Sequence, residues 1–236
     1  MQFNGIRFPV VIYLIGFTIL GLVLAASFTF DIHITRLMAD PVQVHNSKFY
    51  IGFMSNLTVI TWCIGAYLAI FTWSILKRTG GEIEWIRFFK IGGFLTLVLM
   101  LDDLFMFHER IFPHYLFLPK ITGFRPNEKF PIFAYGIFTL WFLYSCRHTI
   151  KKTPWLHLLI AGGFLATSII IDRGIGKYLV PSKFYRSFIE DASKFIGVLG
   201  WSWYFFEVSR AILVARMDKH GVLPASAKPE TPSAEL

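Results

Sequence analysis

Three carboxylates and one histidine fall within eight residues, in the stretch Leu101-Asp102-Asp103-Leu104-Phe105-Met106-Phe107-His108-Glu109. The stretch closes a long apolar run from Phe88 to Met100. Ionisable groups inside a membrane are costly, so they are usually paired or functional. Carboxylates beside an imidazole can move protons or bind a divalent metal. If the apolar run crosses a membrane, the sequence therefore predicts a polar site within it.

Helical spacing orders these side chains. On one continuous helix, Asp102 and Glu109 are seven residues apart and share a face. Asp103 points about a third of a turn away, and His108 lies on neither face. The motif by itself cannot close a metal site, so we expect other helices to complete it.

Composition favours a membrane protein. Of the 236 residues, 55% are hydrophobic and 16% are charged, whereas soluble domains carry about a quarter charged residues. The uncharged run Phe8–Phe30 is long enough to span a bilayer, and we interpret it as an uncleaved first helix. The net charge of +8 resides largely in loops between apolar runs, so nucleic acid is not an expected partner. Cys63 and Cys146 make neither a disulfide framework nor a CxxC pair.

Six apolar segments predict an all-α membrane bundle with about six transmembrane helices. The segments are Phe8–Phe30, Phe49–Leu76, Trp85–Phe107, Phe130–Tyr144, Trp155–Ile171 and Phe188–Val214. Residues 1–217 form one transmembrane domain in this prediction, and residues 218–236, poor in apolar side chains, form a disordered tail.

Basic residues in short loops predict the orientation, because such loops remain in the cytoplasm. Two such loops and the C-terminal flank hold these basic residues: Lys77 and Arg78; Arg147, Lys151 and Lys152; Arg210, Arg216 and Lys219. The loop between the fifth and sixth segments is also basic and does not follow the rule. The bias predicts that both termini lie in the cytoplasm.

Other segments bring polar residues to the same outer depth as Asp102. These residues are Asn56, Asp172, Arg173, Glu190, Asp191 and Lys194. Lys194 follows Glu190 by four residues and Asp191 by three, so it can neutralise either carboxylate along its own helix. We expect the second, third, fifth and sixth segments to share one polar site at the depth of the outer leaflet of the lipid bilayer.

Three functions suit such a site. The first is a metal- or cation-binding membrane hydrolase, with zinc, iron or manganese left open. Its expected metal ligands are Asp102, Glu109, Asp172, Glu190 and Asp191, and its expected catalytic residues are His108 and Asp103. The second is a cation- or proton-coupled transporter using the same carboxylates. The third is a structural or assembly subunit, in which Asp172–Arg173, Glu109–Arg110 and Glu190–Lys194 are ion pairs that fix the helices.

Several motifs carry a resemblance. They are Ser55-Asn56-Leu57 with Trp62-Cys63, Leu-Asp-Asp-Leu-Phe-x-x-His-Glu from Leu101, and Glu-Asp-x-x-Lys-x-x-Gly from Glu190. Together they resemble a family of small bacterial polytopic membrane proteins of unassigned function. The resemblance implies a multi-pass protein of the bacterial inner membrane and implies no reaction. The chain also has a thin similarity to the membrane hydrolases that include alkaline ceramidases and adiponectin-type receptors. That similarity implies zinc-dependent hydrolysis with Ser55, Asp102 or Asp103, and His108, but Glu190 and Asp191 stand where that superfamily has late histidines.

Overall fold

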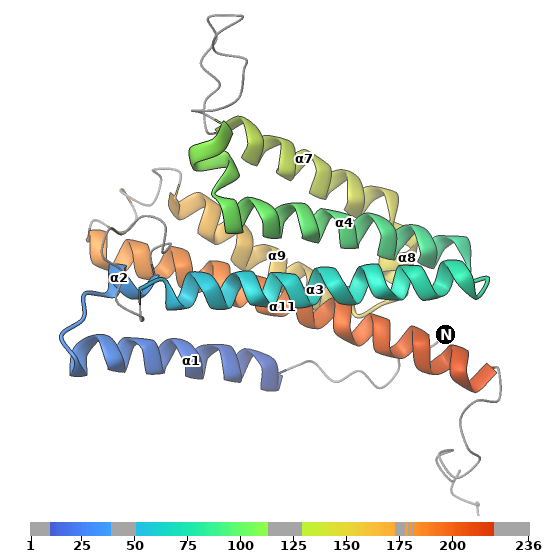
Figure 1. The fold of residues 1–236 in the computed structure, drawn as a ribbon, viewed down its shortest axis with the longest axis horizontal. Helices are drawn as coiled ribbons and strands as arrows, with labels where there is room; N and C mark the ends of the chain where they lie inside the picture. The colour runs from blue at the N-terminus through green and yellow to red at the C-terminus, as the bar shows by residue number, and fades with distance from the viewer. Residues whose placement is uncertain are drawn as a thin grey trace, which may run out of the picture.

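The computed structural model describes residues 10–38, 51–112, 129–172, 178, 180 and 182–219, and every regular element in this part of the chain is a helix (Figure 1). The elements are α1 (Val10–Thr29), α2 (Ile34–Met38), α3 (Phe53–Arg78), α4 (Ile83–Phe105), η2 (Phe107–Ile111), α7 (Lys129–Ser145), α8 (Arg147–Lys151), α9 (Trp155–Ile170) and α11 (Lys183–Lys219). The all-α prediction is confirmed for these residues.

Six of these helices are long, and they coincide with the six predicted segments. They alternate in direction through the bundle (Figure 1), so the chain ends of several helices gather at each end. We call one end the carboxylate end; there α3 and α11 begin and α4 finishes. We call the other the basic end; there α3 and α11 finish and α4 begins.

Aromatic side chains fill the centre of the bundle. Phe88 of α4 is fully buried, and its ring centroid lies 5.7 Å from Phe142 of α7 and 5.7 Å from Phe205 of α11. Trp201 of α11 donates from Nε1 to Thr96 Oγ1 of α4 at 2.9 Å. A second apolar cluster joins α1, α2 and the start of α3 to the middle of α11. The 37-residue helix α11 therefore contacts both parts of the core.

Two glycine pairs occupy similar places in α4 and α9 but differ in packing. A Cβ at Gly93 would lie 2.9 Å from Ile70 of α3, and one at Gly92 would lie 2.6 Å from Phe205. Gly92 and Gly93 therefore let α3 and α11 approach α4 closely. A Cβ at Gly162 or Gly163 would meet nothing within 4 Å, so this pair has no such packing role in the bundle.

Two of the described helices, α1 and α3, are long and apolar enough to cross a membrane. The apolar helices α7 and α9 are shorter than a span. Charged residues near both ends of α4 and in the first third of α11 interrupt the apolar runs of those helices. The six predicted segments are thus confirmed as helices, whereas six membrane spans are not confirmed. The tail predicted from residue 218 lies, beyond Lys219, outside the described residues.

Candidate functional site

The helix α4 ends at Phe105, three residues before His108. Met106 adopts φ 52° and ψ 44°, a left-handed conformation, and its N–H donates to the carbonyl of Asp102. A five-residue π-helical turn, Phe107–Ile111, follows. The prediction of one continuous helix through Phe107 is therefore wrong, and with it the shared face of Asp102 and Glu109. A left-handed residue reverses the chain at a helix end, so His108 returns over the last turn of α4.

Asp102 is the acceptor that holds this reversal. Its Oδ1 accepts the backbone N–H of His108 at 3.0 Å, and its Oδ2 lies 2.6 Å from His108 Nδ1. The hydroxyl of Tyr135, on α7, donates to the same Oδ1 at 3.0 Å. Asp102 is only 8% exposed. A buried carboxylate needs such donors to offset the loss of water, so this network ties α4, η2 and α7 together.

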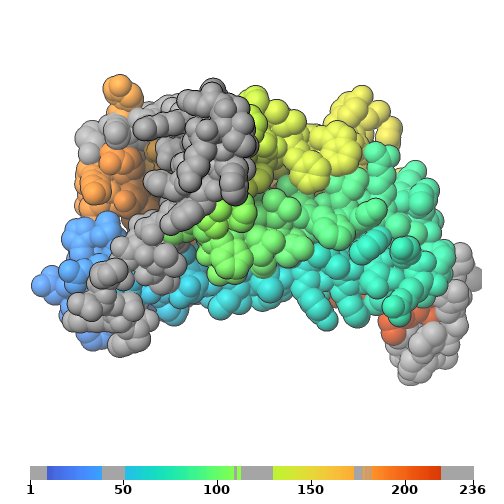
Figure 2. Space-filling model, turned by 45° about the horizontal axis from the view of Figure 1, so that its top comes forward, coloured from blue at the N-terminus to red at the C-terminus, as the bar shows by residue number. Residues whose placement is uncertain are grey.

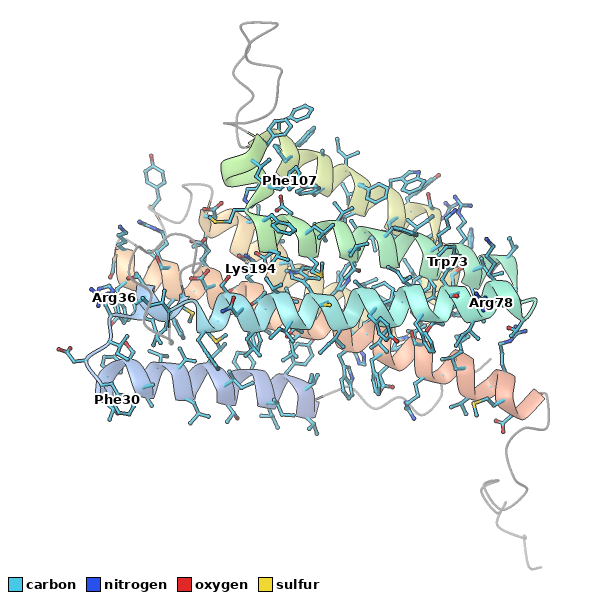
Figure 3. The ribbon with its side chains drawn as sticks, in the orientation of Figure 1. Phe30, Arg36, Trp73, Arg78, Phe107 and Lys194 are labelled. Carbon is cyan, nitrogen blue, oxygen red and sulfur yellow. The ribbon has the colours of Figure 1, made fainter. Side chains whose placement is uncertain are left out.

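Asp103 faces a different helix. Its Oδ1 forms an ion pair with Lys194 Nζ of α11. The Asp103 side chain is 9% exposed and that of Lys194 is 36% exposed. Figure 3 shows Lys194 and Phe107 at the same end of the bundle. Sequence spacing predicted carboxylate partners for Lys194 on its own helix, whereas the ion pair in the structure joins Lys194 to α4. The pairs of Lys194 with Glu190 and Asp191 stay predictions. Consecutive aspartates on a helix diverge by about 100°, so each bonds to a different neighbour.

The remaining predicted residues lie at the same end but are less closely joined. Asp172 is exposed at the end of α9, and Asn56 is exposed in the first turn of α3. Glu190 and Asp191 are half-buried in the first turns of α11, and each takes part in an interaction there. Within the described ranges, no three His, Cys, Asp or Glu side chains group closely enough to hold a metal ion.

Three predicted participants cannot be placed. The side chains of Glu109 and Arg110 and the whole of Arg173 lie outside the described residues. The expected pairs Glu109–Arg110 and Asp172–Arg173, and the role of Glu109 as a ligand, therefore stay predictions.

Sequence reasoning missed Tyr135 and the break at Met106. Tyr135 is one aromatic residue inside the apolar segment Phe130–Tyr144, and nothing in its spacing separates it from packing residues. The break has no glycine or proline at its centre, the two usual markers of a helix end. The signal for the helix end was Asp102 itself. A carboxylate in an apolar run needs a hydrogen-bond donor, and His108 follows six residues later.

The contact with Asp102 assigns a proton to one nitrogen of the His108 ring. A carboxylate can only accept, so the 2.6 Å contact requires the proton to lie on Nδ1. In the neutral ring, Nε2 is then the acceptor nitrogen. The His108 side chain is 19% exposed, so a small molecule can approach it. This arrangement can withdraw a proton from water or ligate a metal through Nε2, with Asp102 orienting the ring in either case.

A family model, a domain of unknown function (DUF8692), matches residues 14–208. The chain belongs to this family. The matched range includes every described residue of the carboxylate end discussed above. No curated protein and no solved structure matches the chain. This match agrees with the resemblance to a family of unassigned function. The comparisons show no link to the ceramidase-type hydrolases.

Proposed function

We propose that the chain is a multi-pass protein of the bacterial inner membrane, with six spans and both termini in the cytoplasm. The exposed side chains of the bundle support this placement. Figure 2 shows α3, α4 and α7 at the surface of one face. Large exposed residues of these helices are apolar, among them Ile60, Tyr67, Phe94, Phe133, Leu140 and Trp141. Exposed apolar surface of this extent needs a lipid or protein environment.

We propose further that the carboxylate end is the active site of a membrane hydrolase. The contact between Asp102 Oδ2 and His108 Nδ1 carries the proposal, because it orients the His108 ring as a general base would need. His108 Nε2 would withdraw a proton from the attacking water. Asp102 would stabilise the imidazolium that results, and Tyr135 would hold Asp102 in place. Lys194, paired with Asp103, supplies a positive charge at the same end for a developing oxyanion.

The residues fit a metal in one role only. Both oxygens of Asp102 already accept hydrogen bonds, and Asp103 pairs with Lys194. These two aspartates are therefore poor direct ligands. His108 remains a suitable ligand through Nε2, because metal-bound histidines commonly donate their other N–H to a carboxylate. A bound divalent metal would supply a more acidic water to the same site.

The proposal is tested with p-nitrophenyl esters of short and long acyl chains as probes, and with metal analysis of the purified protein. Hydrolysis should fall about 10²–10⁴-fold in His108→Asn. The matched control is His33→Asn, since His33 lies near the same end and bonds to Thr35 at 2.7 Å. The control should retain wild-type hydrolysis. Equal activity in both variants, or no hydrolysis by folded wild-type protein, would overturn the hydrolase proposal.

Metal content separates the two roles of His108. If His108 is a ligand, wild-type protein retains about one metal ion and His108→Asn retains none. If His108 is a general base alone, both proteins lack metal and only hydrolysis differs between them.

A second candidate is cation- or proton-coupled transport. The observation that favours it is the ion pair between Asp103 and Lys194, which joins two long helices at a depth where a moving cation could replace the lysine. In proteoliposomes containing a pH-sensitive dye, Lys194→Met should then alter proton flux. If the third candidate, a purely structural role, is right, the same substitution should reduce folded protein without changing flux per molecule.

A further inference from the structure

Two buried hydroxyl groups make no hydrogen bond to the described part of the chain. They are Thr72 Oγ1 of α3 and Ser209 Oγ of α11. Thr72 is 1% exposed and Ser209 is 4% exposed. A buried hydroxyl has lost its bonds to bulk water, and native proteins rarely leave such a group without a replacement. Each of the two hydroxyls therefore calls for a partner.

Thr72 differs from the other buried threonines of the long helices. Thr58, Thr61 and Thr96 each donate from Oγ1 to the carbonyl oxygen four residues earlier, at 2.8, 2.8 and 2.7 Å. A bond of this kind satisfies the hydroxyl within its own helix. Thr72 Oγ1 makes no such bond. Its hydroxyl is thus left for a group outside α3.

Two contacts fix how α3 and α11 lie against each other. Both helices run from the carboxylate end to the basic end (Figure 1). A Cβ added to Gly65 would lie 3.2 Å from Cα of Ser202. Nearer the basic end, Arg216 donates from Nη2 to the carbonyl oxygen of Thr79. Gly65 and Thr79 are fourteen residues apart, and so are Ser202 and Arg216. The two helices therefore keep one register between these contacts.

Thr72 and Ser209 lie midway between the two contacts and at the same level. Thr72 is seven residues from Gly65 and seven from Thr79, and Ser209 has the same position between the contact residues of α11. Residues seven apart share a helix face. Thr72 is therefore on the side of α3 that meets α11, and Ser209 is on the side of α11 that meets α3.

The interface widens towards the basic end. At Gly65 the backbones of the two helices approach closely, whereas at Thr79 the long side chain of Arg216 makes the contact. Figure 1 shows α3 and α11 separating in this direction. Two hydroxyls bond directly only when their oxygens are about 2.7–2.8 Å apart, and Thr72 and Ser209 do not form that bond.

We propose that a water molecule binds between α3 and α11 and bridges Thr72 Oγ1 and Ser209 Oγ. Each hydroxyl carries one hydrogen and two lone pairs, so it can donate to the water or accept from it. Buried waters typically make two to four such bonds to polar groups that lack other partners. The apolar core surrounds the site with Leu76, Val208 and Ile212. The proposal depends neither on hydrolysis nor on transport.

The bridge would complete a series of polar links between the two helices. Ser202 Oγ donates to the carbonyl oxygen of Thr61 at 2.8 Å, and Arg216 makes the last link near the basic end. The water would supply the middle link, one heptad from each of the others. Together the three links would fix the position of α11 along α3, and with it the position of Lys194, which α11 carries at the carboxylate end.

A double-mutant cycle with Thr72→Val and Ser209→Ala tests the bridge by thermal unfolding in mixed detergent micelles. If the water is bound, each single substitution should lower Tm by about 2–4 °C, the shift expected for one lost hydrogen bond in a chain of this size. The double variant should lose less than the sum, because either substitution already breaks the bridge. Hydroxyls that are simply unsatisfied would give the opposite sign, since an apolar replacement then raises Tm.

Thr58→Val is the matched control. It removes a buried threonine hydroxyl from the same helix, but that hydroxyl bonds to the carbonyl oxygen of Met54 within α3. Its effect should add to that of Ser209→Ala without coupling. Unchanged or raised Tm in Thr72→Val and Ser209→Ala, or additive losses in their double variant, would overturn the proposal.

NMR detection of magnetisation transfer from water identifies the bridging molecule in the wild-type protein, so this readout does not depend on the folding of any variant. The amide protons of Thr72 and Ser209 should receive magnetisation from water, and that of Ala69, a fully buried residue of the same helix, should not. Coupling in the mutant cycle without transfer to Thr72 or Ser209 would indicate a direct bond between the hydroxyls. That result would also contradict the proposal.

Discussion

The two ends of the bundle use the same charged residue types in opposite ways. At the carboxylate end, the side chains of Asp102 and Asp103 are 10% and 9% exposed, and they bond to α7 and α11. At the basic end, the pair of Glu84 and Lys152 is about half exposed on both side chains. The buried residues of this end that the structure describes include His157 and Glu207. Buried pairs lose water and depend on their partners, whereas exposed pairs remain solvated and contribute little.

The difference arises where the chain changes direction. At the carboxylate end, the left-handed Met106 brings His108 back over Asp102, so polar groups of one short segment meet inside the bundle. At the basic end, Gly80 has φ 65° and turns the chain between α3 and α4 outside the bundle, which leaves the charged groups near it in water. The reversal at Met106 therefore buries polar groups inside the bundle, whereas the turn at Gly80 leaves charged groups on its surface.

The largest expected effect is at Asp102. Asp102→Ala removes three accepted hydrogen bonds and leaves the Tyr135 hydroxyl and the His108 N–H without their acceptor. We expect a loss of about 2–4 kcal/mol in the free energy of unfolding, measured by equilibrium unfolding in mixed detergent micelles. Tyr135→Phe removes one of the three bonds and should cost about 1 kcal/mol.

Tyr144→Phe is the matched control for this series. Tyr144 lies on the same helix as Tyr135 but is 68% exposed, so its substitution should change stability by less than about 0.5 kcal/mol. If Asp102→Ala is as stable as the control, the carboxylate end is not more tightly coupled than the basic end, and the comparison fails.

The next effect is at the ion pair of Asp103 and Lys194. Lys194→Met should destabilise the protein more than Asp103→Asn, because Asp103 is the more buried partner and Lys194 keeps Glu190 and Asp191 one turn away. A double-mutant cycle should give a coupling energy of about 1–3 kcal/mol. Equal losses for the two single variants, with no coupling, would show that this pair behaves like the exposed one at the basic end.

A smaller effect should follow substitution of Met106. Leucine and isoleucine have the same volume, but a branched Cβ is strongly disfavoured at positive φ. Met106→Ile should therefore be about 1–2 kcal/mol less stable than Met106→Leu, and it should also lose hydrolysis because His108 no longer returns to Asp102. Thermal unfolding of the two variants measures the difference. Similar stability would mean that the reversal at Met106 does not hold the site.

Sequence patterns predicted the helices well because six apolar segments of adequate length leave few alternatives. They failed where a contact joins residues far apart in the chain. Tyr135 reaches Asp102 across 33 residues and Lys194 reaches Asp103 across 91, and neither distance follows from helical spacing. The helix end at Met106 is set by the acceptor Asp102, not by a glycine or proline. Helical spacing also placed His108 away from the face of Asp102, because it assumed that α4 continues past Phe105, where the helix ends.

The smallest effect is at the pair of Glu84 and Lys152, whose charged atoms are 2.7 Å apart. Lys152 lowers the pKa of Glu84, and Glu84 in turn raises the pKa of Lys152. The contribution of Glu84 is complete above its ordinary pKa and disappears as pH falls through the lowered value. That of Lys152 is complete below its ordinary pKa and disappears as pH rises through the raised value.

The difference in Tm between wild type and Glu84→Gln should therefore be small, constant near neutral pH and absent at both extremes. It should also disappear in about 1 M salt, where charges are screened within roughly 3 Å. Lys151→Gln is the control, since Lys151 is exposed beside Lys152 and the bond to Glu84 comes from Lys152. A difference that persists in salt and at every pH would make this pair as protected from water as Asp103 and Lys194. Burial would then not explain the difference between the ion pairs of the two ends.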